Sequence, residues 1–291
     1  MIGMDAIFYL DTRICYVLSK LGIRKDCLHY SSVVQRFVSR TARSIKIDSD
    51  TCNGPNQASK IIWVFWAQGE SEMPSVVKKC YDSICQNRGE YTVVMLNLQN
   101  YGQYVTLPSF IVEKQAKGLI ALAAFSDILR FSLLEKYGGY WMDATIFVTQ
   151  TIIEPKQLFT IKQPYMGDYI SKGRWTGFLW FMPRNHVLSS FVRRYLEFYW
   201  KNYDSIVEYL LVDHVIEYAY EHICLVKTEL DSVKYSNPDL YFFQSEDSEG
   251  AFDEGQWNLI SSRTQFFKTT WKAMRKSCVL AGKTYYGTIL S

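Results

Sequence analysis

The block of residues 126–145, which reads SDILRFSLLEKYGGYWMDAT, constrains the fold of this chain more than any other part of its sequence. Residues three, four and seven apart share one face of a helix, so the spacing predicts Asp127, Arg130 and Tyr137 along one side of a helix. Ser126 is a suitable cap for the first turn, where the helix dipole favours the negative charge of Asp127. The block therefore predicts a helix that carries an acid, a base and a tyrosine on one face.

A glycine turn and a buried strand follow this helix. Gly138 and Gly139 supply the left-handed backbone conformation that commonly ends a helix. The apolar run 140–142 is typical of a short buried strand, and Asp143 stands at its carboxyl end. Open α/β sheets bind their ligands at the carboxyl ends of their strands. We therefore expect the functional site at Asp143.

The block resembles the signature of bacterial capsular polysaccharide synthesis proteins and of the wider DXD-containing sugar transferases, which are glycosyltransferase family 32-like. Members typically read S-D-x-x-R, followed by Y-G-G-x-Y/W-x-D-x-D. Thr145 stands where the broad pattern has its second aspartate, which gives Asp143-Ala144-Thr145. A looser resemblance covers roughly residues 60 to 220.

This resemblance implies an α/β protein with the GT-A-type nucleotide-diphospho-sugar transferase fold, which is a mostly parallel central sheet flanked by helices. It also implies retention of anomeric configuration and a Mn²⁺ or Mg²⁺ ion held by Asp143 and Thr145. Asp127 and Arg130 would bind sugar hydroxyls; alternatively, this pair only fastens the helix to the sheet.

Further donor contacts follow from the same resemblance. Trp66 would stack on the uracil ring of a UDP-sugar, and Trp175 and Thr176 would meet the donor sugar. Tyr137 would contact the ribose or the diphosphate, unless it is a core tyrosine with a bonded hydroxyl. Independently of the resemblance, Lys268 and Lys272, which stand four residues apart near the carboxyl end, are candidates to reach the diphosphate, although surface lysines are common.

A carboxylate and imidazole cluster, Asp213, His214 and Glu217, is open to several interpretations. It would face the acceptor, supply a metal ligand, or form a solvated helix face. A basic stretch with helical spacing has a similar ambiguity: it would make a peripheral membrane contact or pack on the main domain as a solvated face. Its members are Arg36, Arg40, Arg43 and Lys46.

Composition excludes several classes of protein. A net charge of +3 without a basic patch argues against a nucleic-acid partner. Seven scattered cysteines without a C-x-x-C pair predict reduced thiols and a cytoplasmic location. Neither a secretory leader nor a membrane-spanning apolar run is expected. P-loop, dinucleotide-binding and Gly-x-Ser-x-Gly motifs are absent from the sequence, which leaves kinase, dehydrogenase and esterase functions without support.

The pattern along the chain predicts an N-terminal helical extension over residues 1–58 and a second domain over residues 59–291, which the family resemblance implies is GT-A-like. Short aromatic strands are expected from residue 231 onward. Other predicted strands are 61–66, 91–96 and 177–182, and other predicted helices are 75–87, 186–201 and 204–221.

The predicted function is transfer of a hexosyl residue from a UDP-sugar to a saccharide acceptor in capsule or surface polysaccharide synthesis. The acceptor is expected to be lipid-linked, at the inner face of the plasma membrane. Two alternatives remain: an effector-type transferase that glycosylates a protein, and a non-catalytic protein that binds a nucleotide sugar or a partner.

Overall fold

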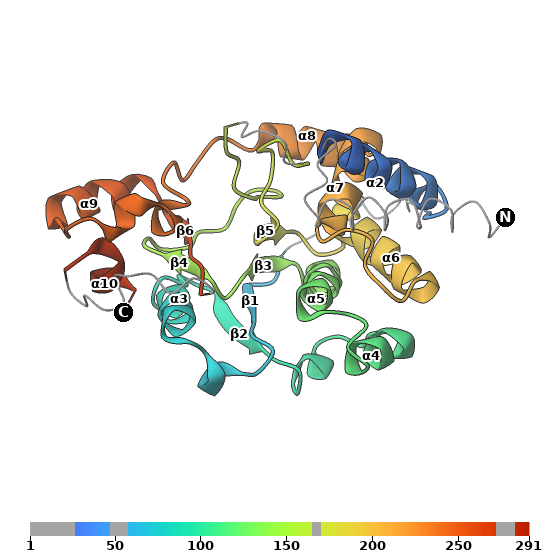
Figure 1. The fold of residues 1–291 in the computed structure, drawn as a ribbon, viewed down its shortest axis with the longest axis horizontal. Helices are drawn as coiled ribbons and strands as arrows, with labels where there is room; N and C mark the ends of the chain where they lie inside the picture. Colours follow the sequence, from blue (N-terminus) through green and yellow to red (C-terminus); the bar gives the residue numbers. More distant parts are fainter. Residues whose placement is uncertain (1–26, 47–57, 165–169, 272–282, 291) are drawn as a thin grey trace.

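In the computed structural model, a four-stranded sheet lies between helices that cover both of its faces (Figure 1). The structure describes residues 27–46, 58–164, 170–271 and 283–290. The strand order is β2-β1-β3-β5; β1 is parallel to β2 and to β3, and β5 is antiparallel to β3. The mostly parallel sheet expected from the sequence is thus confirmed. The strands are β1 (Ile61–Phe65), β2 (Thr92–Leu96), β3 (Gly139–Met142) and β5 (Leu179–Met182).

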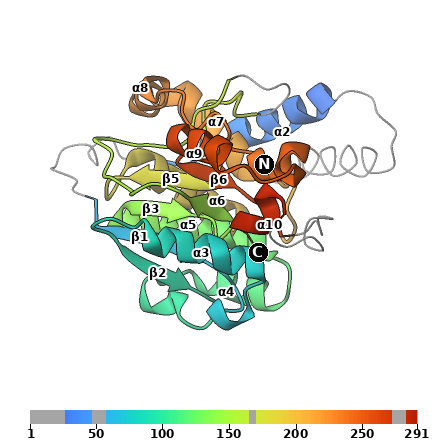
Figure 2. The ribbon, with the colours of Figure 1, turned by 90° about the vertical axis from the view of Figure 1, so that its left-hand side faces the viewer.

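Side chains that alternate along β1 divide the core into two layers. Ile62 and Val64 are fully buried in one cluster with residues of α3 (Ser75–Gln86), whereas Trp63 is buried in another cluster with residues of α5 (Leu122–Tyr137). Successive side chains of a strand point to opposite faces, so α3 and α5 cover opposite faces of the sheet. Figure 2 shows α3 toward the viewer, with the strands behind it.

Two glycines with positive φ join α5 to β3, as the sequence predicts. Gly138 has a φ of 68° and Gly139 a φ of 91°. A Cβ atom on Gly139 would lie 2.4 Å from the carbonyl oxygen of Ile61, so β3 can approach β1 only without a side chain at this position. The indole nitrogen of Trp63 also donates to the carbonyl oxygen of Gly138 over 3.1 Å.

The start of α5 differs from the prediction. The helix begins at Leu122 after Ala121, so Ser126 does not cap it and Asp127 is not in the first turn. Alanine and leucine are the strongest helix formers, and the run 121–124 extends the helix by one turn beyond the expected start. Asp127 therefore lies near the middle of α5, away from the helix terminus.

A second layer of helices lies beyond α5. The predicted helices 186–201 and 204–221 correspond to α6 and α7, but α7 starts only at Leu211. Both helices pack mainly on other helices: α6 packs mainly on α5 and α7, and α7 packs on α2, α6 and α8. The elements are α2 (Cys27–Ala42), α4 (Ser109–Ala116), α6 (Val187–Asn202), α7 (Leu211–His222) and α8 (Cys224–Ser232).

The extension joins the main core through α2. Val34, Phe37 and Val38 of α2 are buried in the same cluster as the α5 residues. The Nδ1 atom of the buried His214 donates to Gln35 Oε1 over 2.7 Å, and burial lowers the pKa of His214 to about 3. The basic stretch of α2 thus belongs to a helix that packs on α7. The division of the chain at residue 58 stays a prediction, and residues 1–26 and 47–57 lie outside the described residues.

The C-terminal part is mainly helical, which corrects the expectation of several short strands. A two-stranded antiparallel sheet pairs β4 with β6, and helices surround it. The elements of this part are β4 (Ile146–Val148), β6 (Phe266–Lys268), α9 (Glu254–Arg263), α10 (Tyr285–Ile289) and the 3₁₀ helices η4 (Phe242–Gln244) and η5 (Glu246–Glu249). Two further 3₁₀ helices, η2 (Glu70–Glu72) and η3 (Tyr101–Gln103), lie earlier in the chain.

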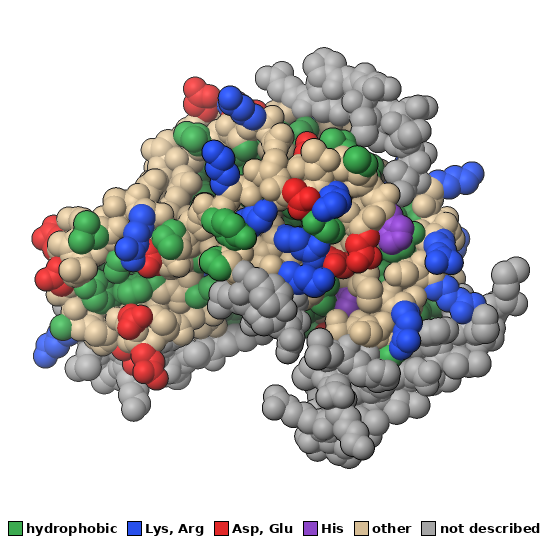
Figure 3. Space-filling model, turned by 90° about the horizontal axis from the view of Figure 1, so that it is seen from above, with side chains coloured by type: hydrophobic (Ala, Val, Ile, Leu, Met, Phe, Trp, Pro, Cys, Tyr) green, Lys and Arg blue, Asp and Glu red, His purple; other side chains and the backbone are tan. Residues whose placement is uncertain are grey.

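Among the described helices, none combines the length and the hydrophobicity that crossing a membrane requires. On the face shown in Figure 3, the described basic and acidic side chains lie interspersed. A large field of one sign therefore does not dominate this face.

The glycine turn generates a stability prediction. Gly139→Ala should lower the free energy of unfolding by more than about 3 kcal/mol, because alanine combines a strained positive φ with a backbone clash. Urea denaturation monitored by tryptophan fluorescence measures the change. Gly102→Ala is the matched control, since a Cβ atom there meets no atom within 4 Å. Equal stability of the two variants would contradict this account of the turn.

Candidate functional site

Three adjoining cavities open around the carboxyl end of β3. The tryptophan cavity has a volume of about 540 Å³, the carboxylate cavity about 370 Å³ and the aromatic cavity about 440 Å³. The tryptophan cavity is lined by Trp66, Ser126, Asp143, Thr145, Lys268 and Trp271, among others. The carboxylate cavity is lined by Asp127, Arg130, Asp143, Tyr209, Asp213 and Lys268, among others. The aromatic cavity is lined by Gln163, Trp175, Thr176, Phe178, Asp213 and Tyr241, among others.

Shared wall residues show that these cavities lie directly beside one another. Asp143 and Lys268 line both the tryptophan and the carboxylate cavities. Asp213 and Phe178 line both the carboxylate and the aromatic cavities. An extended ligand can therefore reach from Trp66 past the carboxylates, while a second ligand approaches from the other side.

Arg130 joins the helix carboxylate to the strand carboxylate. Its Nη1 donates to Asp127 Oδ1 over 2.7 Å, and its Nη2 donates to Asp143 Oδ1 over 3.2 Å. The guanidinium also lies 5.1 Å from the ring centre of Trp141, whose indole nitrogen donates to Asp143 Oδ1 over 3.0 Å. Arg130 is only 5% exposed, so its orientation is fixed by these partners. The sequence thus correctly placed Asp127, Arg130 and Asp143 together.

A lysine from the distant C-terminal part holds the other oxygen of the strand carboxylate. Lys268 Nζ donates to Asp143 Oδ2 over 3.1 Å and to Thr145 Oγ1 over 2.7 Å. The sequence pattern suggested that Lys268 reaches the diphosphate, but it did not indicate the contact of Lys268 with Asp143 and Thr145. The strand β6 brings it there, because Lys268 pairs with Ile146 in the ladder between β4 and β6.

The pKa values of the three carboxylates of the site are shifted in different directions. Burial raises the pKa of Asp127 to about 6, although the neighbouring Arg130 opposes this effect. Burial also acts on Asp143, but Lys268 and Arg130 outweigh it and hold the pKa of Asp143 below its usual range. Burial raises the pKa of Asp213, whose Oδ1 accepts from the indole nitrogen of Trp175 over 2.8 Å. Asp143 is therefore the anion that stays ionised over the widest pH range.

The tryptophan cavity carries two aromatic rings at its rim. Trp66 is half-buried, and its ring centre lies 5.6 Å from that of Trp271, at an interplanar angle of 79°. Trp271 is 46% exposed, so an incoming planar ring can reach this pair. The sequence indicated Trp66; Trp271 was missed because no local pattern links it to β1.

Other predicted site residues lie elsewhere. The Tyr137 hydroxyl donates to the carbonyl oxygen of Tyr104 over 3.0 Å, and its ring packs on Trp63. Tyr137 stands ten residues after Asp127 on α5, roughly 15 Å along the helix axis, so it does not line the three cavities. Its core interpretation holds. Lys272 lies outside the described residues.

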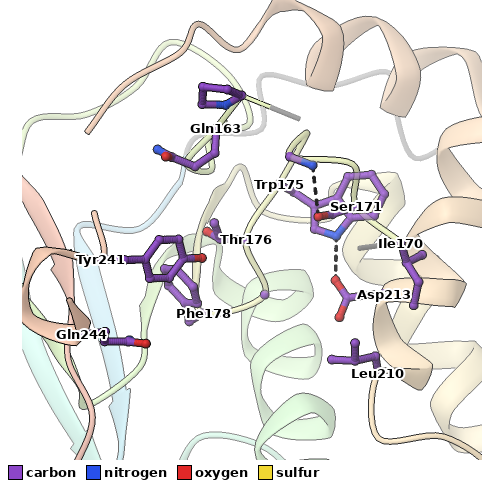
Figure 4. A pocket seen from close by; sticks show the side chains of 13 residues that line it. Gln163, Ile170, Ser171, Trp175, Thr176, Phe178, Leu210, Asp213, Tyr241 and Gln244 are labelled. Carbon is purple, nitrogen blue, oxygen red and sulfur yellow. Dashed lines mark hydrogen bonds between the residues drawn. The ribbon is translucent and has the colours of Figure 1, made fainter. Parts of the chain in front are cut away.

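Two of the predicted donor-binding residues line the aromatic cavity and not the tryptophan cavity. Trp175 and Thr176 line the aromatic cavity, and Figure 4 shows the Trp175 indole pointing toward Asp213. Asp213 and Glu217 are not on a solvated face, which corrects that interpretation: Glu217 is 6% exposed and pairs with Arg174. Because α7 begins at Leu211, Asp213 stands in its first turn, beside the cavities.

The expected divalent ion needs several oxygen ligands and a site free of other cations. Hard cations such as Mg²⁺ and Mn²⁺ take about six oxygen ligands. Within the described ranges, no group of three or more His, Cys, Asp or Glu side chains gathers to hold a metal ion. The Lys268 ammonium lies against both predicted ligands, and a dication about 4 Å from it would be repelled by roughly 8 kcal/mol at an effective dielectric constant near 20. The donor set in this arrangement does not fit a divalent ion, and metal binding by Asp143 and Thr145 stays a prediction.

Comparisons with known proteins agree with the expected family. The family model described as "Capsular polysaccharide synthesis protein" matches residues 16–289. The chain is also 27% identical over 121 residues to the O-glycosyltransferase PaGT of the fungus Phomopsis amygdali. That match covers 36% of this chain and 30% of the fungal protein, so it spans less than a third of this relative's length.

The raised pKa of Asp127 generates a pH prediction. Its folded-state pKa of about 6 lies above the ordinary value of 3.8, so on raising the pH the unfolded chain loses this proton first. Asp127 therefore lowers the free energy of unfolding as the pH rises from about 4 to 6. Asp127→Asn removes this effect, and its stability relative to wild type should increase by about 2 kcal/mol between pH 4.5 and 7.5.

Urea denaturation at several pH values measures this difference. Asp239→Asn is the matched control, because the hydrogen bond from Arg263 lowers the pKa of Asp239 and places its titration below this window. The relative stability of the control should stay constant from pH 4.5 to 7.5. A pH-independent difference for Asp127→Asn would show that this carboxylate is not held with a raised pKa.

Proposed function

We propose that this chain, which belongs to the capsular polysaccharide synthesis protein family, is a glycosyltransferase of the GT-A type that moves a hexosyl group from a UDP-sugar to a saccharide acceptor. Its metal-binding motif carries Thr145 in place of the second aspartate. The observation that carries the proposal is the network of Asp127, Arg130, Asp143 and Lys268. Two of its members, Asp143 and Lys268, line both the tryptophan and the carboxylate cavity, and the tryptophan cavity also contains Trp66. The O-glycosyltransferase PaGT, which matches part of the chain, supports the same class of reaction.

The donor fits across the first two cavities. A nucleobase placed against Trp66 and Trp271 gains stacking and apolar contact, which is worth about 1–3 kcal/mol for a base on an aromatic ring. The diphosphate then faces the Lys268 ammonium, which lines both cavities. The sugar enters the carboxylate cavity, where Asp127 Oδ2 accepts no hydrogen bond from the described part of the chain and is available to a sugar hydroxyl.

Sugar transfer needs stabilisation of the leaving diphosphate. The bond between the anomeric carbon and the diphosphate oxygen breaks with its electron pair on the diphosphate, while the acceptor oxygen bonds to the anomeric carbon and its hydroxyl proton passes to the departing diphosphate. Fixed positive charges that face the developing anion lower this barrier, and a partly enclosed site strengthens their effect. Lys268 is the positive group at the leaving-group side, and Asp143 holds its ammonium in place.

The acceptor fits the aromatic cavity. Phe178 and Tyr241 form an edge-to-face pair with ring centres 6.4 Å apart, and amide and hydroxyl side chains surround them (Figure 4). Aromatic faces combined with amides suit the apolar faces and hydroxyl groups of a sugar. Asp213 lies between this cavity and the carboxylate cavity, so its carboxylate is placed to accept a hydrogen bond from an acceptor hydroxyl. Retention of configuration and a lipid-linked acceptor remain part of the proposal on the strength of the family resemblance.

Donor turnover tests the proposed reaction. A panel of nucleotide sugars is first screened for thermal stabilisation of the protein, because a ligand that binds the native state raises the unfolding temperature. With the donor found, Asp143→Ala should lower turnover on the order of 10²-fold or more, since it releases both the Lys268 ammonium and the Arg130 guanidinium. Asp239→Ala, at an ion pair outside the three cavities, is the control.

Two results would contradict the proposal. Turnover of Asp143→Ala within a few-fold of wild type would exclude this network from catalysis. Donor binding without any hydrolysis or transfer by the wild type would favour the non-catalytic alternative, which the threonine at position 145 motivates.

The acceptor assignment has its own test. Tyr241→Ala should raise the KM for a saccharide acceptor about tenfold, because one stacking surface of the aromatic cavity is lost. Hydrolysis of the donor in the absence of acceptor should not change, since Tyr241 does not line the tryptophan or the carboxylate cavity. Tyr235→Ala serves as the matched control, because Tyr235 is 66% exposed and lies outside all three cavities. An equal effect of both substitutions on KM would place the acceptor elsewhere.

A further inference from the structure

Lys268 occupies the position at which the sequence predicts a divalent cation. Its Nζ lies 3.1 Å from Asp143 Oδ2 and 2.7 Å from Thr145 Oγ1, which are the oxygens of the two expected metal ligands. The side chain of Lys268 is 18% exposed, so its ammonium is partly withdrawn from water. A single positive charge therefore already bridges the Asp143-Ala144-Thr145 turn.

The backbone fixes the lysine in this place. Lys268 is the last residue of β6, and its amide donates to the carbonyl oxygen of Leu240 over 2.7 Å. The amide and the hydroxyl of Thr269 both donate to the carbonyl oxygen of Thr145, over 2.9 and 3.0 Å. The ammonium also lies 4.7 Å from the ring centre of Phe178. These contacts hold the start and the end of the lysine side chain beside Thr145.

The remaining oxygen of Asp143 is also in use. Asp143 Oδ1 accepts from Arg130 over 3.2 Å and from the indole nitrogen of Trp141 over 3.0 Å. A divalent ion at this turn would have to displace Lys268 and would then be left beside a displaced ammonium. Arg130, which is buried and held by Asp127 as well, adds a second positive charge on the same carboxylate.

We infer that the Lys268 ammonium is the built-in cation of this site and that a nucleoside diphosphate binds here without a divalent metal. An ammonium has three N–H donors. Asp143 and Thr145 accept two of them, which leaves one for a phosphate oxygen in the cavities that Lys268 lines. Asp143 positions the lysine, and threonine in place of a second aspartate keeps the turn from carrying a further negative charge. The inference rests on the proposed function for the identity of its ligand.

Two measurements test it, and both use the full chain. Isothermal titration calorimetry measures the binding of uridine diphosphate to the wild type in EDTA and in Mn²⁺, and electron paramagnetic resonance measures direct Mn²⁺ binding without nucleotide. We expect wild-type affinity for uridine diphosphate to agree within threefold between EDTA and Mn²⁺, and we expect no Mn²⁺ binding by the wild type at submillimolar concentrations.

Lys268→Met removes the charge and keeps a side chain of similar length. In EDTA this variant should bind uridine diphosphate at least tenfold more weakly than the wild type. It should also acquire Mn²⁺ binding, because Asp143 and Thr145 are released, and Mn²⁺ should restore part of its affinity for uridine diphosphate. Lys60→Met is the matched control, since Lys60 forms exposed ion pairs with Glu90 and Glu154 outside the three cavities and should behave as the wild type.

The outcomes separate this inference from the proposed function. The inference would be overturned if the affinity of the wild type for uridine diphosphate rose tenfold or more with Mn²⁺, or if the wild type bound Mn²⁺ directly. Neither result requires a variant. Lys268→Met with unchanged affinity in EDTA would overturn it as well. If uridine diphosphate does not bind at all, the proposed donor is wrong, and the Mn²⁺ measurement on the wild type and on Lys268→Met still decides which cation this turn accepts.

Discussion

The pairing of the partly buried Asp143 carboxylate with two cations is the interaction on which the arrangement of this protein depends. A carboxylate withdrawn from water is costly unless it is paired and hydrogen-bonded. Here one partner, Arg130, comes from the helix just before the strand, and the other, Lys268, stands 125 residues later in the sequence. The charge balance of the central strand is therefore complete only when the C-terminal part has folded against it. One ionic network thus ties the parallel sheet, α5 and the small β4–β6 sheet into a common structure.

Much of the central fold was predictable because its signals are local. The apolar run at β1, the amphipathic pattern of α3 and the strand β2 were placed within a residue or two of their observed bounds. Gly138 and Gly139 marked the end of α5 because positive φ is a requirement of the backbone itself. The pairing of Asp127 with Arg130 also followed from helical spacing alone. Each of these features depends on neighbours within a few residues.

The rest of the site depends on contacts between distant segments, which a single sequence does not reveal. Nothing near Lys268 indicates that β6 runs antiparallel to β4 and brings its ammonium to Thr145. Asp213 seemed to belong to an exposed helix face because the late start of α7 was not recognised. Tyr137 shares a helical face with Asp127, yet the length of α5 carries it away from the cavities, to a partly buried position against the core. In each case contacts with distant segments decided the role of the side chain.

The contact between α2 and α7 has a consequence for how this protein tolerates change. Gln35 satisfies the imidazole of His214, and the next residue toward the N-terminus, Asp213, forms the partition between the carboxylate and aromatic cavities. Sequence drift in α2 therefore alters the support beneath that partition, although α2 itself lines none of the three cavities. Substitutions in this remote helix can therefore change ligand preference indirectly, in addition to substitutions of the residues that touch the ligand.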